Sequence, residues 1–216
     1  MTVDFLKGDA SSSGDGQHLS GAMVAVAEIV NRLVAERYVW PIGHTRFQKL
    51  CYFASEAGIP LEVAFEERPY GPFAVGLKRL ISLLVNNGVI QERASGRYQL
   101  IEPGPTFNDA ERRFESSLAE YRNAIDKVTD LMLRLHPGRT ELAATVHFAA
   151  HASARALGRP PTDAEVIENV RRWKRDKFQD AEVTAALASL AMLDWLHLGG
   201  TEVIDKIDEE SAVAFA

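Results

Sequence analysis

Apolar residues in the first third of the chain recur every three or four positions in three segments. This spacing predicts helices over about 20–37, 45–57 and 72–87. Ser20 and Thr45 stand where the first two helices begin, and their hydroxyl groups are typical of N-caps. The pattern therefore predicts a helical N-terminal region with two capped helix starts.

Shorter segments with alternating apolar and polar residues lie among these helices. Residues 61–68, LEVAFEER, predict a strand. The Tyr70-Gly71-Pro72 sequence after it is expected to open the third helix, with Pro72 at the first helical position. Residues 89–101 predict two strands around an Ala-Ser-Gly turn. The order helix, helix, strand, helix, hairpin is close to that of a winged-helix domain.

Residues 105–198 carry helix signals throughout. Asn108 and Glu111 resemble a capping box that opens a long helix ending near Leu135. Further helix starts are predicted at Thr140, at Thr162 with its capping-box partner Glu165, and at Asp180. We therefore expect a mainly α protein with a small β-hairpin: a winged-helix-like N-terminal half plus a helical C-terminal lobe.

Composition divides the chain into four parts. Residues 1–18 are rich in Ser, Gly and Asp and predict a disordered leader. The winged-helix-like lobe is expected over 19–104 and the helical lobe over 105–198. Residues 199–216 form an acidic tail with five acidic side chains and one basic side chain, whereas the remainder is nearly neutral. The absence of a basic excess gives no support to sequence-independent nucleic-acid binding.

The sequence predicts a soluble, cytoplasmic protein without a membrane partner. It has a single cysteine, so no internal disulfide can form, as is usual in a reducing compartment. The N-terminus lacks the basic and apolar regions of a signal peptide. No apolar run reaches the eighteen or so residues of a membrane span.

Candidate reactive residues are few. His147 and His151 have the four-residue spacing that can hold zinc, but Phe148 stands where a metalloprotease motif has glutamate. We expect one of these histidines in the core and the other at its edge. Cys51 lies on an apolar helix face and is expected to be a buried structural residue. The sequence contains no phosphate-binding loop or nucleophile motif. We therefore predict a non-enzymatic protein without a cofactor or metal.

Two groups of basic residues are candidates for contacts with a partner. The first is a basic run on a predicted helix. The default interpretation is a solvated helix face, and the more specific interpretation is contact with phosphate or with an acidic partner. This run comprises Arg171, Arg172, Lys174, Arg175 and Lys177. The second, Arg93 and Arg97, stands beside the predicted hairpin tip, as in a wing that contacts DNA, although Glu92 offsets its charge.

Several separated motifs resemble those of one family. A Phe-Gln-Lys-Leu-x-Tyr-Phe helix is followed by an apolar strand and Tyr-Gly-Pro, at Phe47, Gln48, Lys49, Leu50, Tyr52, Phe53, Tyr70, Gly71 and Pro72. With ELAATVHFAA and VRRWKRDKF, this order resembles the Panacea-type toxin-neutralising domains. It is most similar to the C-terminal domain of DarG-type antitoxins, and the resemblance spans about residues 40–198. Only about forty residues precede it, so the ADP-ribose-removing macrodomain of those antitoxins is not expected here.

The resemblance implies direct binding to a cognate toxin, for which an ADP-ribosyltransferase is the class suggested. On this hypothesis Gln48, Lys49, Tyr52, Tyr70 and Phe73 form a polar and aromatic patch. Arg171, Arg172, Lys174 and Arg175 are further candidate partner contacts. The structural interpretation remains open beside it: the same motif holds the fold, and Tyr-Gly-Pro only starts a helix.

Two functions therefore follow from the sequence, and an enzyme of unrecognised type, for which only His147, His151 and Cys51 speak, is a third hypothesis. The first is an antitoxin-like protein that neutralises a toxin by direct binding. In a variant of this hypothesis, the protein delivers the toxin to a protease, and the apolar terminus AVAFA after the acidic run serves as a degradation tag. The alternative is a winged-helix DNA-binding transcriptional regulator that uses Arg93 and Arg97.

Overall fold

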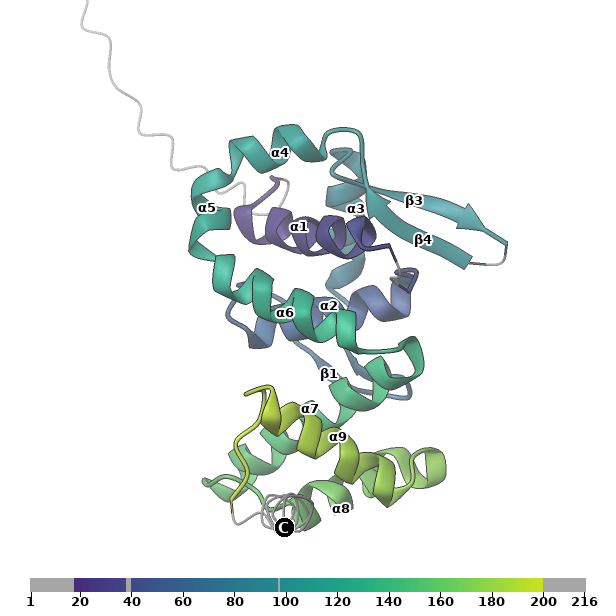
Figure 1. Ribbon diagram of the computed structural model, residues 1–216, viewed down its shortest axis with the longest axis vertical. Coiled ribbons are helices and arrows are strands. Elements are labelled where there is room, and N and C mark those ends of the chain that lie inside the picture. Colours follow the sequence, from purple (N-terminus) through teal and green to yellow (C-terminus); the bar gives the residue numbers. More distant parts are fainter. Residues whose placement is uncertain (1–17, 38–39, 97, 200–216) are drawn as a thin grey trace, which may run out of the picture.

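The computed structural model describes residues 18–37, 40–96 and 98–199, and the predicted leader and acidic tail lie almost entirely outside these residues. This part of the chain forms helices and two small antiparallel sheets, which are arranged as Figure 1 shows. The prediction of a mainly α fold with a small β-hairpin is confirmed. In chain order the elements are α1 (Gly21–Ala35), α2 (His44–Glu56), β1 (Glu66–Arg68), β2 (Gly71–Phe73), α3 (Leu77–Asn86), β3 (Ile90–Ser95), β4 (Tyr98–Pro103), α4 (Phe107–Arg113), α5 (Glu115–Glu120), α6 (Arg122–Arg134), α7 (Pro137–Leu157), α8 (Asp163–Lys174), the 3₁₀ turn η1 (Arg175–Lys177) and α9 (Asp180–Met192).

Helix α1 is the centre of the upper part of the molecule in Figure 1. Ser20 caps it as predicted, because the Met23 amide donates to the Ser20 hydroxyl at 3.3 Å. Residues 24–27 and 29–30 are completely buried, since α1 packs against α3, α4, α5, α6 and β4. Burying each such Val or Ile side chain stabilises the fold by about 1.5–3 kcal/mol. The N-terminal core is therefore closed by helix α6 from the second half of the chain.

The predicted hairpin over 89–101 is confirmed as β3–β4. Its strands pair antiparallel, with Ile90 opposite Pro103 and Ser95 opposite Tyr98. Ile90 and Ile101 are buried at its base, whereas most of β3 is exposed. The hairpin extends sideways from the upper helices (Figure 1). The winged-helix assignment stays a prediction.

The Tyr-Gly-Pro segment does not start a helix, and this prediction is wrong. Gly71 adopts φ +87°, and Gly71–Phe73 pairs as strand β2 with Glu66–Arg68. The chain reverses at the Pro69-Tyr70 turn, so Pro72 lies in an extended segment and α3 begins only at Leu77. The positive φ favours glycine because a side chain there meets its own backbone.

Two other predictions at helix starts are wrong. Thr45 does not cap α2: Gly43 holds the N-cap position without a side-chain hydrogen bond and forms a β-bridge with Leu100. The long helix predicted from Asn108 is instead α4, α5 and α6, with bends at Phe114 and Tyr121. The chain bends because both α5 and α6 pack against α1. A straight helix could not follow that surface.

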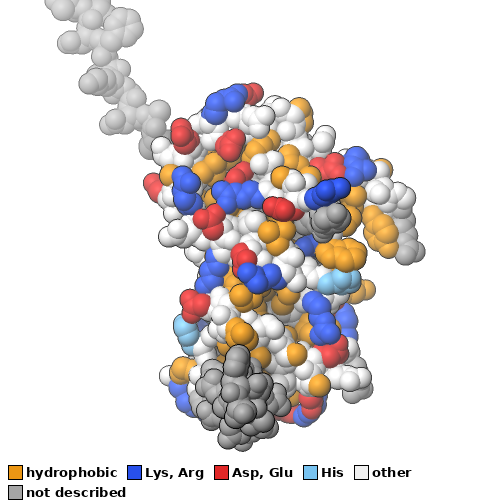
Figure 2. Space-filling model, in the orientation of Figure 1, with side chains coloured by type: hydrophobic (Ala, Val, Ile, Leu, Met, Phe, Trp, Pro, Cys, Tyr) orange, Lys and Arg blue, Asp and Glu red, His pale blue; other side chains and the backbone are white. Residues whose placement is uncertain are grey.

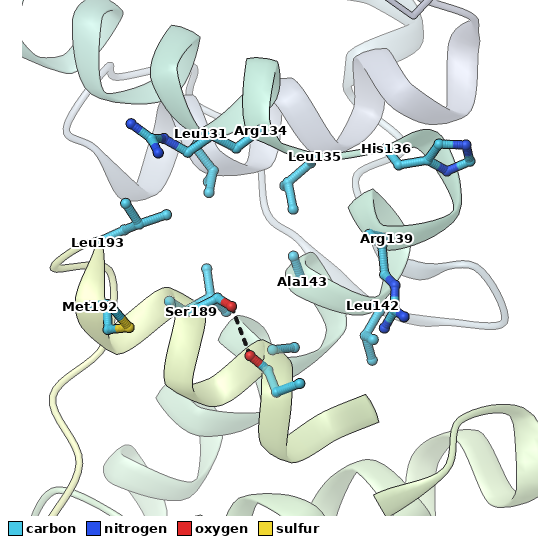
Figure 3. Close-up of a pocket in the computed structure, with 13 residues that line it drawn as sticks. Leu131, Arg134, Leu135, His136, Arg139, Leu142, Ala143, Ser189, Met192 and Leu193 are labelled. Atoms are coloured by element: carbon cyan, nitrogen blue, oxygen red, sulfur yellow. Dashed lines mark hydrogen bonds between the residues drawn. The ribbon is translucent and has the colours of Figure 1, made fainter. Parts of the chain in front are cut away.

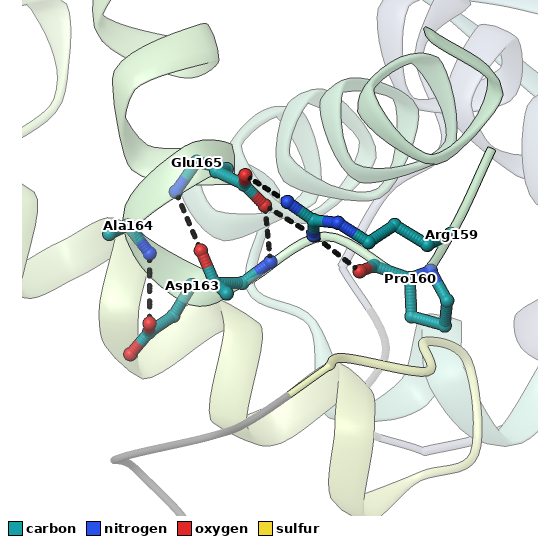
Figure 4. Close-up of polar contacts among 6 residues, drawn as sticks. Arg159, Pro160, Asp163, Ala164 and Glu165 are labelled. Atoms are coloured by element: carbon teal, nitrogen blue, oxygen red, sulfur yellow. Dashed lines mark hydrogen bonds and ion pairs between the residues drawn. The ribbon is translucent and has the colours of Figure 1, made fainter. Parts of the chain in front are cut away.

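The lower helices begin and end largely where the sequence indicates. Thr162 and Glu165 form the predicted capping box, and Arg159 holds the Glu165 carboxylate at 2.6 and 2.9 Å (Figure 4). Gly158 ends α7 with φ +66°. Helix α7 starts earlier than predicted because His136 caps it, and α9 has Gln179 rather than Asp180 at its N-cap.

Replacing Gly71 by alanine is expected to destabilise the fold more than replacing Gly58. Both glycines have positive φ, which costs about 1–2 kcal/mol for an alanine. A Cβ on Gly71 would also lie 3.0 Å from Thr145 Oγ1 and 3.3 Å from Lys49 Cε, whereas Gly58 has open space. Overpacking adds roughly 1–3 kcal/mol. Urea denaturation of Gly71→Ala and Gly58→Ala measures the difference, and equal losses would contradict this packing.

Candidate functional site

The β1–β2 pair presents Tyr70 on the surface. Its two-residue turn, Pro69-Tyr70, leaves the tyrosine 68% exposed while Gly71 and Pro72 behind it are buried. We call residues 66–73 the Tyr70 hairpin. Strand β2 packs against α2 and α7, so the hairpin is fixed from below by helices of both halves of the chain.

Helix α2 holds the inner strand of the Tyr70 hairpin through its Gln-Lys pair. Lys49 is 1% exposed, and its Nζ donates to the Pro72 carbonyl at 2.6 Å. The Ala74 amide donates to Gln48 Oε1 at 3.3 Å. Burial lowers the pKa of Lys49 to about 8, although Glu141 opposes the shift. Both side chains of the pair therefore bind backbone groups rather than solvent.

Helix α8 holds the turn of the Tyr70 hairpin through Lys174. Its Nζ donates to the Pro69 carbonyl at 2.5 Å and to Glu141 Oε1 at 2.7 Å. Lys177 donates to the same carboxylate oxygen at 2.6 Å, and its Nζ lies 5.2 Å from the centre of the Tyr70 ring. Burial raises the pKa of Glu141, but hydrogen bonds from both lysines outweigh it, and the net shift is downward.

The predicted patch of motif residues is not a surface patch. Gln48, Lys49 and Tyr52 are buried, and Phe73 is half-buried. Only Tyr70 is largely exposed. The sequence pattern does not distinguish these positions because a lysine or glutamine at helical spacing is usually solvated, whereas here backbone carbonyl and amide groups bind them inside. The three buried residues therefore offer almost no side-chain surface to a partner.

The basic run of α8 also divides between interior and surface. Lys174 is buried, contrary to the solvated-face prediction. Arg171 pairs with Glu168 at 2.9 Å and Asp180 at 2.5 Å. Arg172 and Arg175 are exposed and form no ion pair with a described residue. These two arginines are therefore the members of the run with charge available for another molecule.

A groove joins the Tyr70 hairpin to the end of α8. It has a volume of about 390 Å³ and lies beside the turn that carries Tyr70. Its lining combines cations, one carboxylate and an indole ring: Glu67, Arg68, Pro69, Trp173, Lys174, Arg175 and Lys177. We call this the Tyr70 groove. Sequence elements about a hundred residues apart thus meet at one basic and aromatic surface.

The sequence pattern did not point to Glu141, whose carboxylate connects Lys174 and Lys177. It is the only carboxylate in α7, a helix otherwise rich in alanine and other small residues. A single carboxylate in such a segment is a signal of a cationic partner, since unpaired buried charges are rare. The partners themselves lie on another helix, and the sequence does not identify them.

The β3–β4 hairpin offers less charge than predicted. Arg93 donates to Glu102 from two nitrogens, at 2.9 and 2.6 Å, so its charge is already compensated. Arg97 lies outside the described residues. On the face shown in Figure 2, basic and acidic side chains are interspersed rather than gathered by sign. No observation here specifically favours DNA binding.

The remaining candidate residues occupy the interior or its edge. Cys51 is completely buried, and burial raises the pKa of its thiol. His147 is 1% exposed and His151 is half-exposed, so the expected division between core and edge is confirmed. Tyr52 donates from its hydroxyl to His147 Nδ1 at 2.7 Å.

A separate cleft of about 520 Å³ lies between the α6–α7 junction and α9 (Figure 3). Its floor is apolar, with Leu131, Leu142 and Leu190. Arg134 and Arg139 stand at its rim, but they pair with Asp130 and Glu182. The lining offers apolar contacts and contains no carboxylate or cysteine.

No protein-family model matches the chain, and no curated protein matches it either. The resemblance to toxin-neutralising domains therefore rests on the motifs and stays a hypothesis. None of the helices in the described part of the chain is long and apolar enough to cross a bilayer.

The buried Lys49 predicts an unusual rise of stability with pH. Its pKa is about 8 when folded and near 10.4 when unfolded, so between these values the unfolded chain binds more protons. Stability relative to Lys49→Met is expected to rise from pH 8 to 9.5, by at most about 1.4 kcal/mol per pH unit. Urea denaturation of both proteins measures this difference. A difference that stays flat or falls would contradict a desolvated ammonium.

Arg175 carries backbone strain at the edge of the Tyr70 groove. Its φ of 50° and ψ of −127° lie in a region that disfavours side chains and costs of order 1–3 kcal/mol. Arg175→Gly is therefore expected to be about 1 kcal/mol more stable than Arg175→Ala. Both variants lose the guanidinium, so the difference in stability between them reports the backbone strain at position 175. Thermal unfolding measures it, and an alanine variant as stable as the glycine variant would exclude strain.

Proposed function

We propose that this protein acts by direct binding to a partner protein, in the manner of an antitoxin, and that the Tyr70 groove is the binding surface. The observation that supports the proposal is the joint anchoring of Tyr70 and the basic end of α8 by Lys174 and Glu141. Without that anchor the two segments would be independent surface features. With it they form one pre-shaped surface.

The residues of this surface suit protein recognition. Tyrosine, tryptophan and arginine dominate the energetics of protein interfaces, because they combine a large contact area with hydrogen-bonding groups. The Tyr70 groove is lined by Trp173 and Arg175, and the Tyr70 ring lies beside it, 5.2 Å from Nζ of the lining residue Lys177. Arg172 is exposed on the same helix, α8. Exposed guanidinium groups favour an acidic partner surface, on which they form paired hydrogen bonds with carboxylates.

Rigidity adds to the case for a binding role. Association costs free energy when side chains and loops become ordered. The Tyr70 hairpin is already held at two places, by Lys49 at Pro72 in strand β2 and by Lys174 at Pro69 in the turn. Binding would therefore order little beyond exposed side chains. The motif resemblance suggests a toxin of the ADP-ribosyltransferase class as the partner, which the protein would block without making or breaking a bond.

Variants of the exposed residues test the proposal. Tyr70→Ser and the double variant Arg172→Glu with Arg175→Glu are each expected to weaken partner binding about 30-fold or more, the effect of removing an interface anchor. The partner to use is the product of the adjacent gene. Calorimetry gives the affinity, and growth during co-expression shows neutralisation. Lys78→Glu, an exposed charge reversal on α3, is the matched control and should bind as the wild type does.

Three outcomes would overturn the proposal. The wild-type protein neither binds nor neutralises the adjacent gene product, or the Tyr70 and arginine variants bind as well as Lys78→Glu does. The third is a gel shift with the protein's own promoter that weakens steeply with salt. That result would support the DNA-binding alternative instead.

A further inference from the structure

Helices α2 and α7 bring together two pairs of residues with the same spacing. Tyr52 and Glu56 are four apart on α2, and His147 and His151 are four apart on α7. This spacing puts each pair on one helix face. One ligand atom from each of Glu56, His147 and His151 lies within 4.8 Å of the others. Two imidazoles and a carboxylate thus lie close together at the edge of the α2–α7 interface.

His147 is oriented as metal-binding histidines usually are. Its Nε2–H donates to the Trp195 carbonyl at 3.0 Å, which fixes the tautomer and leaves the Nδ1 lone pair facing Tyr52. A hydrogen bond from the second ring nitrogen to a carbonyl is the common support of a histidine ligand. Burial, with a smaller contribution from the neighbouring His151, lowers the pKa of His147 to about 3.

The other two groups have suitable distances and access. His151 Nδ1 lies 3.4 Å from Glu56 Oε2. Tetrahedral zinc with bonds of about 2.0–2.1 Å separates neighbouring ligand atoms by roughly 3.3–3.4 Å. The His151 ring stacks on His147 with 4.3 Å between centres. His151 and Glu56 are 41% and 29% exposed, which gives an ion an entry path and gives both side chains room to rotate.

We propose that Glu56, His147 and His151 form a binding site for a divalent transition-metal ion of the zinc type. The Glu56 carboxylate offsets part of the ion's charge, and water or the Tyr52 hydroxyl completes the coordination. Tyr52 must release His147 Nδ1 for this to happen. The bound ion cross-links α2 to α7, the two helices that support the Tyr70 hairpin. The inference does not depend on the proposed function.

Zinc titration of the full chain after chelator treatment tests this site. Calorimetry should show one zinc ion per chain, and the melting temperature should rise with zinc. His151→Ala and Glu56→Gln change partly exposed residues, so both variants are expected to fold and to bind zinc at least tenfold more weakly. His44→Ala is the matched control, because His44 also pairs with a carboxylate, Glu92 at 2.6 Å, away from these ligands. It should bind zinc as the wild type does.

The proposal fails if the wild-type protein takes up much less than one zinc ion. It also fails if both ligand variants retain the wild-type affinity, or if His44→Ala loses affinity as much as they do. Circular dichroism of each variant without zinc shows whether it is folded. If His151→Ala alone proves unfolded, Glu56→Gln decides the question.

Discussion

Buried lysine side chains that bind backbone carbonyl groups are the interaction on which the Tyr70 surface depends. Lys49 donates to the carbonyl of Pro72 in strand β2, and Lys174 donates to the carbonyl of Pro69 in the turn. A buried ammonium is tolerated only when its protons are bound and its charge is offset. Glu141 supplies the charge for Lys174 directly and attracts Lys49 from a greater distance. One carboxylate therefore sustains both attachments of the hairpin.

This arrangement makes the surface a property of the whole fold. The Tyr70 hairpin contributes one short sheet, α2 and α8 contribute the lysines, and α7 contributes Glu141. Loss of one partner in such a cluster leaves a buried charge uncompensated, which typically costs about 3–5 kcal/mol. The cluster also explains why an exposed tyrosine next to a glycine is held in one position. Its backbone is fixed although its ring is in solvent.

The features that the sequence predicted correctly are decided by nearby residues, although the starts of α2, α7 and α9 are also local and were predicted at the wrong residues. The Ser20 cap, the Thr162 capping box and the β3–β4 hairpin each depend on residues a few positions apart. The division of the predicted 108–135 helix depends on α1, which α5 approaches so closely that a Cβ on Gly21 would overlap Ser117. The burial of Lys49 depends on a carbonyl 23 residues away. Periodicity carries no information on either contact.

The buried residues of the Gln-Lys and Tyr-Gly-Pro motifs therefore hold the backbone of the Tyr70 hairpin in position and do not themselves form a recognition surface. Gln48 and Lys49 each bind a backbone group next to or within β2, so in this chain their role is to hold the hairpin. Gly71 serves the same role, because its φ of +87° and its close neighbours make a side chain there unfavourable. On the proposed binding role, recognition uses side chains that the hairpin and α8 expose, namely Tyr70, Arg172 and Arg175. In this chain the motifs therefore explain how the hairpin is held, and they do not by themselves identify a partner.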